Sequence, residues 1–201
     1  MGILDKLLSR HPEQDFWPWF EQNSMRLAEV STGHERICGE LVARLHRVHK
    51  SLTFVFGPVR DGRREFIVSA DGIRDAFPAV RSLVAAAPDI PGWQIIAFRP
   101  ATGTDVTIQM ANCSLGPEDV WFHADRQDGK VGLTLYIRDM TPENEKLLCG
   151  AMFLLLDSAI GEYDVETKVG SLRWLPLPID PVAEGLKPFR DLPDKVRMVA
   201  G

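Results

Sequence analysis

The stretch DGRREFIVSADGIRDAFPAV, residues 61–80, sets the order of structural elements for the chain. Asp61-Gly62 lies between two apolar runs, and this dipeptide is a strong hairpin signal because glycine tolerates the positive φ of a tight turn. Residues 65–70 are a strand candidate, and Ser69-Ala70-Asp71-Gly72 forms a second turn. The apolar spacing that follows predicts a helix starting near Phe77. A hairpin, a corner and a helix in close succession indicate mixed α and β structure.

The same succession occurs a second time further along the chain. Alternating residues at 52–56 precede the first turn, and residues 93–98 form a strand after the first helix. The second hairpin–helix–strand unit spans residues 118–175. Its members are strands at 120–123 and 131–137, a turn at 127–130, a helix at 143–159 and a strand at 168–175. Duplication and the ordinary tendencies of a compact chain both account for the repeat, and the sequence leaves these alternatives open.

These elements predict an α+β fold in a single domain, residues 1–178. We expect N-terminal helices over residues 1–50, and one mixed, mostly antiparallel sheet with its helices over 51–178. The helix at 143–159 is apolar nearly all round, which predicts a buried helix between the sheet and the N-terminal helices. Residues 179–201 are rich in proline and predict a tail without regular structure.

The charge and the apolar runs argue against two classes of partner. The chain has 23 Lys and Arg against 28 Asp and Glu, and it lacks the basic excess of a general nucleic-acid binder. The longest apolar run, residues 150–161, is well short of the about 20 residues that span a membrane. No signal peptide is recognisable at the N-terminus. We therefore expect a cytoplasmic, bacterial protein that binds neither nucleic acid nor membrane.

Cysteine usage agrees with a reducing compartment. Cys38, Cys113 and Cys149 are odd in number, widely spaced and form no C-x-x-C motif. A disulfide framework or a structural zinc site is therefore not expected. The interpretation is three partly buried, reduced thiols.

A dense aromatic group near the N-terminus is the first candidate site. It consists of Phe16, Trp17, Trp19 and Phe20. Large aromatic side chains dominate hydrophobic cores, which favours an anchor that docks the N-terminal helices. The alternative is an exposed partner-binding patch made of the same four residues. Trp93, Trp121 and Trp174 are also candidates to line a small-ligand pocket, although a place in the core is favoured.

An acidic group is the second candidate site. It consists of Asp157, Glu162, Asp164 and Glu166. If residues 162–166 are extended, their three carboxylates point to one side, and such a set could bind Mg²⁺ or Ca²⁺. The spacing does not fit the usual calcium-binding loop. The alternative is a solvated turn in which Asp157 caps a helix or pairs with an arginine.

Three segments carry a family resemblance: REFIVSADGI, FPAVRSLVAAAPDIPGW and LLDSAIGEYDVETKVG. Together they resemble a family of uncharacterised bacterial proteins, a domain of unknown function, over about residues 14–178. The resemblance implies that the aromatic stretch, the Asp71-Gly72 corner and the Gly-Glu-Tyr-Asp stretch belong to one recurring unit. It supplies no catalytic residues.

The sequence lacks several motifs that would indicate an enzyme. There is no G-x-S-x-G, no P-loop and no G-x-G-x-x-G. We therefore expect a non-enzymatic protein that needs no cofactor and binds or regulates another protein, or associates with itself. The alternative is a metal-assisted hydrolase that uses the acidic group at 157–166, so enzymatic activity stays open.

Overall fold

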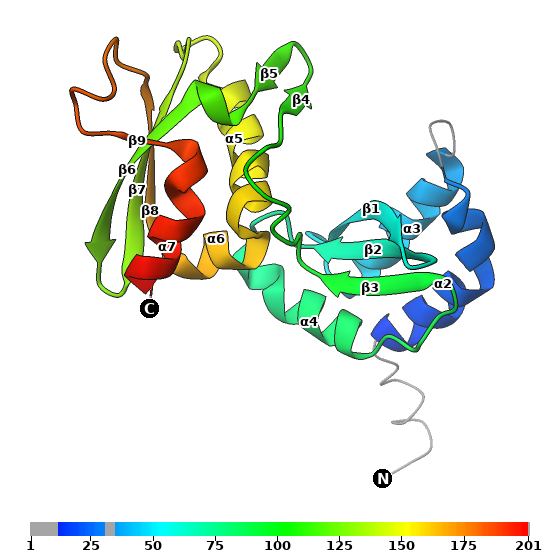
Figure 1. Ribbon diagram of the computed structural model, residues 1–201. Helices are drawn as coiled ribbons and strands as arrows, with labels where there is room; N and C mark the ends of the chain where they lie inside the picture. Colours follow the sequence, from blue (N-terminus) through cyan, green and yellow to red (C-terminus); the bar gives the residue numbers. More distant parts are fainter. Residues whose placement is uncertain (1–11, 31–34, 201) are drawn as a thin grey trace. The chain divides into compact units, whose positions relative to one another are not determined.

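The computed structural model describes residues 12–30 and 35–200 (Figure 1). The chain divides into two compact units, residues 1–98 and 99–201. Helices and strands are mixed in both units, so the expected α+β class is confirmed. The short helix expected within the first eight residues lies outside the described residues.

Within its described residues, the first unit contains three α-helices, one short 3-10 helix and a three-stranded sheet. Its elements are α2 (Pro12–Ala28), α3 (Glu35–Val48), β1 (Thr53–Arg60), β2 (Arg63–Ser69), η1 (Arg74–Ala76), α4 (Phe77–Ala85) and β3 (Trp93–Ala97). The strand order is β1-β2-β3, with β1 antiparallel and β3 parallel to β2. Asp61 and Gly62 form the predicted two-residue turn, both with positive φ (50° and 74°). The helix and strand order of residues 61–80 is therefore as predicted.

Arg64 ties this sheet to the end of α2. Its guanidinium donates to the carbonyl oxygens of Leu27 (3.2 Å), Ala28 (2.6 Å) and Val30 (3.1 Å). The same group lies over the ring of Phe56, 4.8 Å from its centroid. The last carbonyls of a helix have no partner within the helix, and a cation there also interacts favourably with the helix dipole. One side chain of β2 thus fixes the C-terminal end of α2.

We expect Arg64→Ala to destabilise the protein by about 1–3 kcal/mol, because three carbonyl oxygens lose a charged donor. Urea denaturation followed by circular dichroism measures this change. Arg36→Ala is the matched control, since the Arg36 side chain is 92% exposed and pairs with Glu40 one helical turn away. The control should change the free energy of unfolding by less than about 0.5 kcal/mol. Equal effects of the two substitutions would contradict the capping role.

The second unit contains the larger sheet. Its elements are β4 (Ile108–Met110), β5 (Cys113–Leu115), η2 (Pro117–Asp119), β6 (Val120–Gln127), β7 (Lys130–Ile137), α5 (Glu145–Ile160), α6 (Glu162–Lys168), β8 (Val169–Pro176), β9 (Lys187–Pro188), η3 (Phe189–Asp191) and α7 (Leu192–Ala200). Four strands form a sheet in the order β8-β7-β6-β9, and β4 and β5 form a separate hairpin. β7 is antiparallel to β6 and parallel to β8.

Helices bury one face of this four-stranded sheet. The inward side chains of β7 alternate along the strand and are at most 1% exposed: Val131, Leu133, Leu135 and Ile137. They share one core cluster with Met152 and Leu155 of α5 and Leu192 and Val196 of α7. Figure 1 shows α5, α6 and α7 on the same side of the sheet. Every second residue of the strands therefore points to a face that the core does not use, which we call the helix-free face.

The prediction of a tail without regular structure is wrong, because residues 187–200 form β9, η3 and α7, and apolar side chains of η3 and α7 are buried. Phe189 and Leu192 are fully buried, and Val196 is 2% exposed. Leu192 and Val196 are four residues apart and share one helical face. Pro193 lies in the first turn of α7, where proline is tolerated because its missing N–H has no helical partner.

The expected single sheet is also corrected. The strands form three sheets, although antiparallel pairs do outnumber parallel ones as expected. The predicted domain 1–178 spans both compact units, and its end falls inside the second. The predicted helix at 143–159 is α5, and it is buried on the second unit's sheet. α2 and α3 contribute to the core of the first unit instead. Among the described helices, none has the length and apolar character to cross a membrane.

Candidate functional site

The N-terminal aromatic group forms core and cannot serve as a partner-binding surface. Phe16, Trp17 and Phe20 are between 0% and 3% exposed, and Trp19 is half-buried. Phe20 lies against Phe66 of β2, with ring centroids 4.6 Å apart. The indole Nε1 of Trp17 donates to the carbonyl oxygen of Leu83 in α4 (2.9 Å). Phe16, Trp17 and Phe20 therefore belong to the core, as an anchor of the N-terminal helices would, and Trp19 lies at its margin.

We expect Phe20→Ala to cost about 3–5 kcal/mol of unfolding free energy, because it leaves a cavity among packed rings. Met25→Ala is the control on the same helix, since Met25 is 79% exposed. It should stay within about 0.5 kcal/mol of the wild type. Guanidinium denaturation followed by tryptophan fluorescence separates the two. A small effect at Phe20 would show that the aromatic group does not support the core.

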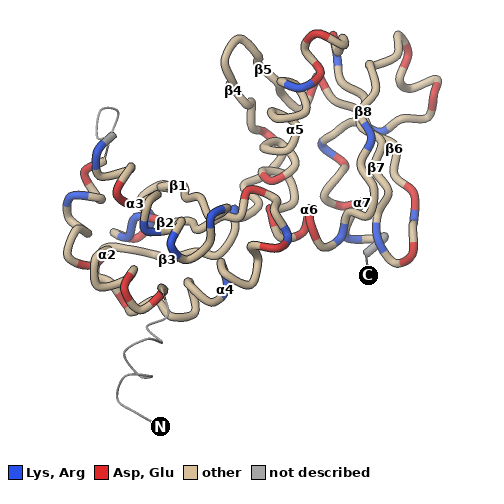
Figure 2. The backbone as a smooth tube through the Cα atoms, turned by 180° about the vertical axis from the view of Figure 1, so that it is seen from behind, with Lys and Arg blue, Asp and Glu red and all other residues tan. Residues whose placement is uncertain are grey.

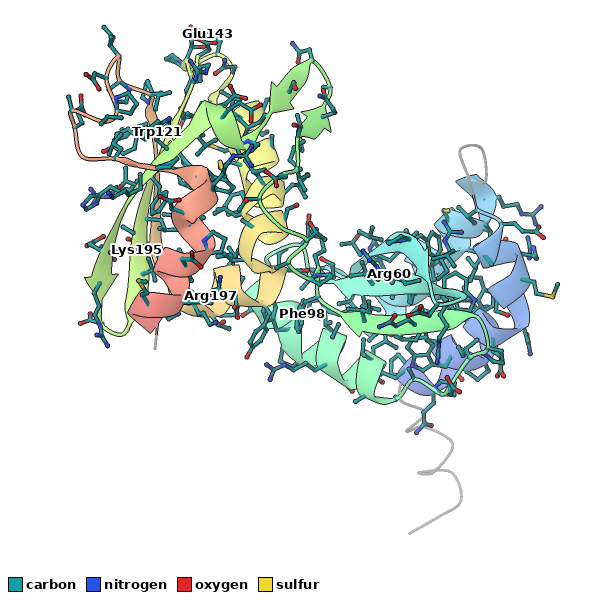
Figure 3. All side chains as sticks on the ribbon, in the orientation of Figure 1. Arg60, Phe98, Trp121, Glu143, Lys195 and Arg197 are labelled. Atoms are coloured by element: carbon teal, nitrogen blue, oxygen red, sulfur yellow. The ribbon has the colours of Figure 1, made fainter. Side chains whose placement is uncertain are left out.

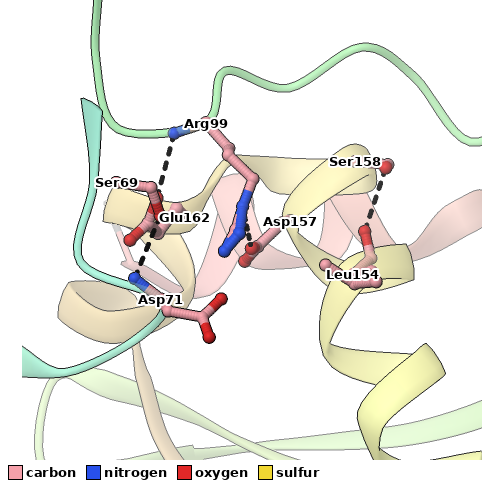
Figure 4. Close-up of polar contacts among 7 residues, drawn as sticks. All are labelled: Ser69, Asp71, Arg99, Leu154, Asp157, Ser158 and Glu162. Atoms are coloured by element: carbon pink, nitrogen blue, oxygen red, sulfur yellow. Dashed lines mark hydrogen bonds and ion pairs between the residues drawn. The ribbon is translucent and has the colours of Figure 1, made fainter. Parts of the chain in front are cut away.

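The acidic group is divided between two helices, and its buried members bind Arg99 (Figure 4). Glu162 is 1% exposed, and its Oε2 accepts a hydrogen bond from the backbone N–H of Arg99 (3.0 Å). The Oδ2 of Asp157, a residue 8% exposed, lies 3.3 Å from the Nε of Arg99. The N–H of Glu162 in turn donates to the carbonyl oxygen of Arg99 (2.9 Å). Buried carboxylates need such partners, because unpaired burial of a charge is costly.

Residues 162–168 are helical and not extended, so the three carboxylates of this segment do not point to one side. Asp164 pairs with Lys168 one turn later, with Oδ2 and Nζ 2.7 Å apart. Residues two apart on a helix lie about 200° apart around its axis, so Asp164 points away from Glu162 and Glu166, which are one turn apart on the same side. Among the described residues, no group of three or more His, Cys, Asp or Glu side chains could hold a metal ion. The expected one-sided arrangement is therefore wrong.

The acidic residues act as a clamp on the first residues of the second unit. In addition to the Arg99 contacts, the N–H groups of Thr102 and Gly103 donate to the carbonyl oxygen of Ser158 (2.8 and 3.0 Å). Gly161 joins α5 to α6 with a φ of 87°, and a Cβ there would meet the N atom of Ala101 at 3.3 Å. The α5–α6 corner thus holds residues 99–103 in place.

The Asp71 corner is structural, as expected. The N–H of Asp71 donates to the Oγ of Ser69 (3.0 Å), and the N–H of Ile73 donates to the carbonyl oxygen of Ala70 (3.0 Å). Asp71 and Gly72 both have positive φ, at 52° and 74°. These contacts close a tight turn between β2 and the helices that follow.

A cavity of about 240 Å³ lies near the N-terminal end of α5. It is lined by residues of β5, of the loop after β7 and of α5: Asn112, Cys113, Ser114, Leu115, Asp119, Arg138, Asp139, Asn144, Leu147 and Leu148. Asp119 pairs with Arg138 (3.1 Å), and the Oδ1 of Asn144 accepts from the N–H of Thr141 (2.8 Å). Its described lining holds no histidine or lysine that could activate Cys113 as a nucleophile. The cavity therefore offers no recognisable catalytic arrangement.

Cys149 on α5 lies in an environment that opposes ionisation of its thiol. Burial raises the pKa of Cys149 above its ordinary value, and the carboxylate of Glu145 raises it further. The thiolate is the nucleophilic form, so a raised pKa leaves less of it at neutral pH. This environment suits a structural cysteine.

We expect Glu145→Gln to lower the pKa of Cys149 and to speed its alkylation at pH 8, because a negative neighbour no longer opposes the thiolate. Iodoacetamide labelling of a Cys38→Ser, Cys113→Ser background, followed by mass spectrometry, measures the rate. The difference in alkylation rate between the two proteins should shrink as the pH rises, because Cys149 then ionises in both. Glu143→Gln, a change to a fully exposed carboxylate nearby in sequence, is the control. An unchanged rate in Glu145→Gln would contradict the assigned cause.

The strongest candidate for an interaction site is β8, the outer strand of the larger sheet. No described strand pairs with its free edge. Trp174 of β8 packs edge to face against Phe153 of α5, with centroids 5.3 Å apart, and Phe153 is still 45% exposed. On the next residue, Leu175 is 43% exposed. We define the β8 surface as Phe153, Arg173, Trp174 and Leu175.

Strand register places these residues on opposite faces of the sheet. Trp174 pairs with the buried Leu135, so its side chain lies on the helix side. Leu175 pairs with Tyr136, which pairs with Trp121, which pairs with Pro188. Of these residues, Trp121 of β6 is labelled in Figure 3. This row of apolar and aromatic side chains crosses the helix-free face from edge to edge. Beyond the end of β8, Ile179 and Val182 are fully or largely exposed.

No protein-family model, curated protein or solved structure matches this chain. The family resemblance of the three sequence segments stays a prediction.

Sequence reasoning found β8 as a strand but not as a site. The segment 168–175 was predicted as a strand, yet its position at the edge depends on which strands pair. Trp121 and Trp174 were expected in the core, and both are half-buried on the larger sheet, whereas Trp93 is 1% exposed. The sequence signal that could have indicated an interaction site is the scarcity of charge in β8, where Arg173 is the one ionisable residue.

Proposed function

We propose that this chain is a non-enzymatic protein that binds or regulates a protein partner through the β8 surface. The observation that supports the proposal most is an outer strand with exposed apolar side chains on both of its sides, Phe153 on one and Leu175 on the other. Outer strands in natural proteins are usually shielded by charges, proline or irregularities. β8 has one arginine in eight residues, a register irregularity at Gly170 near its start and a proline only at its end, so residues 171–175 contain neither a bulge nor a proline.

The composition of the β8 surface supports a protein partner. Tryptophan, tyrosine and arginine are the residues that most often dominate binding energy in protein interfaces, whereas lysine and glutamate are depleted there. Trp174, Arg173 and the neighbouring Tyr136 and Trp121 fit this pattern. Burying a half-exposed phenylalanine or leucine contributes at about 25 cal/mol per Å² of apolar area. Such a surface can therefore stabilise a complex without any chemistry on the partner.

The contacts of the ionisable residues favour binding over catalysis. Asp157 and Glu162 are bound to Arg99, and Asp164 is bound to Lys168. A metal-assisted hydrolase would need carboxylates that converge on an ion. The proposed partner-binding function needs no metal and no cofactor.

We propose the cytoplasm of a bacterium as the compartment. Cys38, Cys113 and Cys149 are free thiols and partly buried. Proteins of oxidising compartments commonly pair their cysteines, whereas free thiols are usual where glutathione and thioredoxin keep them reduced.

A photo-cross-linking amino acid at position 175 tests the function in the cells that naturally make the protein. We expect a discrete covalent adduct with one partner protein, because Leu175 is exposed within the proposed interface. The same amino acid at position 198 is the control, since Met198 is 78% exposed on α7. Phe153→Asp should remove the adduct at 175, because a charge would replace an apolar contact. Equal labelling at 175 and 198, or no adduct at 175, would refute the proposal.

A further inference from the structure

We infer that the β8 surface binds an extended peptide segment of the partner, which adds to the sheet as a further strand and alternates apolar with acidic residues. This inference rests on the proposed function and specifies its partner. Three features of the β8 surface would bind this peptide: free backbone hydrogen-bonding groups, apolar side chains on the helix side, and a positive charge on the helix-free side.

The backbone of β8 supplies the first feature. An outer strand has N–H and C=O groups along its free edge that can pair with another chain. β8 is eight residues long, which matches the length of peptides that bind by strand addition. An added strand would lie about 4.8 Å from β8, with alternate side chains on the two faces of the sheet. The peptide's chemistry can therefore differ between its two sides.

The two sides of β8 differ in character. On the helix side, Trp174 and the 45% exposed Phe153 offer an apolar contact. On the helix-free side, Arg173 is exposed and forms no ion pair within the described chain. Register places Arg173 beside Thr134, and Thr134 beside His123. Apolar residues of an added strand would thus face Phe153 and Trp174, and its other residues would face Arg173.

The positive charge near β8 favours binding of an acidic peptide. Residues 99–201 contain 16 acidic and 11 basic residues, so this unit carries the whole net charge of −5 (Figure 2). The helix-free face differs from this average, because it carries Arg173 and Lys130 against Asp125. Screening limits the reach of exposed charges to about 8 Å at physiological ionic strength. A strand added about 4.8 Å from β8 lies within that distance of Arg173.

A second copy of the chain fits this edge less well. Antiparallel pairing of two copies keeps the helix-free sides of both β8 strands on one face, so pairing about Arg173 or Leu172 places the two Arg173 side chains directly or diagonally opposite each other, with like charges close together. No carboxylate occurs in β8 to compensate. A peptide with acidic residues at alternate positions has the complementary charge.

Two fluorescein-labelled octapeptides test the inference with purified full-length protein. Both alternate Val or Leu with a charged residue, which is Glu in one peptide and Lys in the other. By fluorescence anisotropy, the Glu peptide should bind at least about tenfold more tightly than the Lys peptide. Arg173→Glu should weaken the Glu peptide about fivefold. Arg126 of β6 is also exposed, but it pairs with the buried Val131 and therefore lies on the helix side of the sheet. Arg126→Glu makes the same charge change there and should alter binding less than about twofold.

Backbone N-methylation distinguishes strand addition from other modes of binding. The backbone N–H groups of an added strand point alternately toward β8 and away from it. N-methylation of the residues whose N–H groups point toward β8 should abolish binding of the Glu peptide. N-methylation of the residues in between should be tolerated. Equal loss for both sets would overturn strand addition. Equal affinity of the Glu and Lys peptides, or no binding by either, would overturn the inference.

Failure of the peptide inference is separable from failure of the proposed function. Photo-cross-linking at position 175 reports a partner of any sequence, so an adduct without peptide binding would leave the function supported and the peptide inference refuted. A dimer by light scattering that Leu175→Glu dissociates would identify a second copy as the occupant. That result would also overturn the peptide inference.

Discussion

One-sided burial of the four-stranded sheet is the constraint on which the rest of the second unit depends. The apolar residues of β7 alternate strictly, so α5 and α7 can bury only one face of the sheet. The residues of β7 that lie between these apolar residues must then face away from the core. β8 has β7 on one edge and no described strand on the other, and it therefore presents both a free edge and part of the helix-free face. The proposed interaction site is a direct result of this arrangement.

Carboxylates in this chain serve mainly to hold segments together. Glu162 and Asp157 bind the backbone and side chain of Arg99, respectively, and both are almost completely buried. Arg64 has the corresponding role in the first unit, where a guanidinium holds backbone carbonyls at the end of α2. In both units a single charged side chain fixes the position of a segment distant in sequence. Residues that stand out in the sequence for their charge are therefore poor guides to chemistry in this protein.

Local signals predicted the hairpins and the buried helix, and non-local pairing limited the rest. Asp61-Gly62 and Asp128-Gly129 adopt positive φ at both positions, as the dipeptides predict. The helix predicted at 143–159 begins at Glu145, after a short turn in which the Oδ1 of Asn144 accepts a hydrogen bond from the N–H of Thr141. The segment 162–168 is short enough to be extended or helical, and the positive φ of Gly161 precedes its helix. Neither the separation into three sheets nor the outer position of β8 is encoded within a local window of sequence.

The clamp at Arg99 also decides where the second unit can be separated from the first. A fragment that starts at residue 104 would lack Arg99 and would leave Asp157 and Glu162 buried without it. Loss of the Arg99 contacts from these buried carboxylates favours their protonation or local opening of the α5–α6 corner. A gene fragment for isotope labelling or crystallisation of this unit should therefore begin at or before Arg99, even though residues 99–107 contain no regular secondary structure.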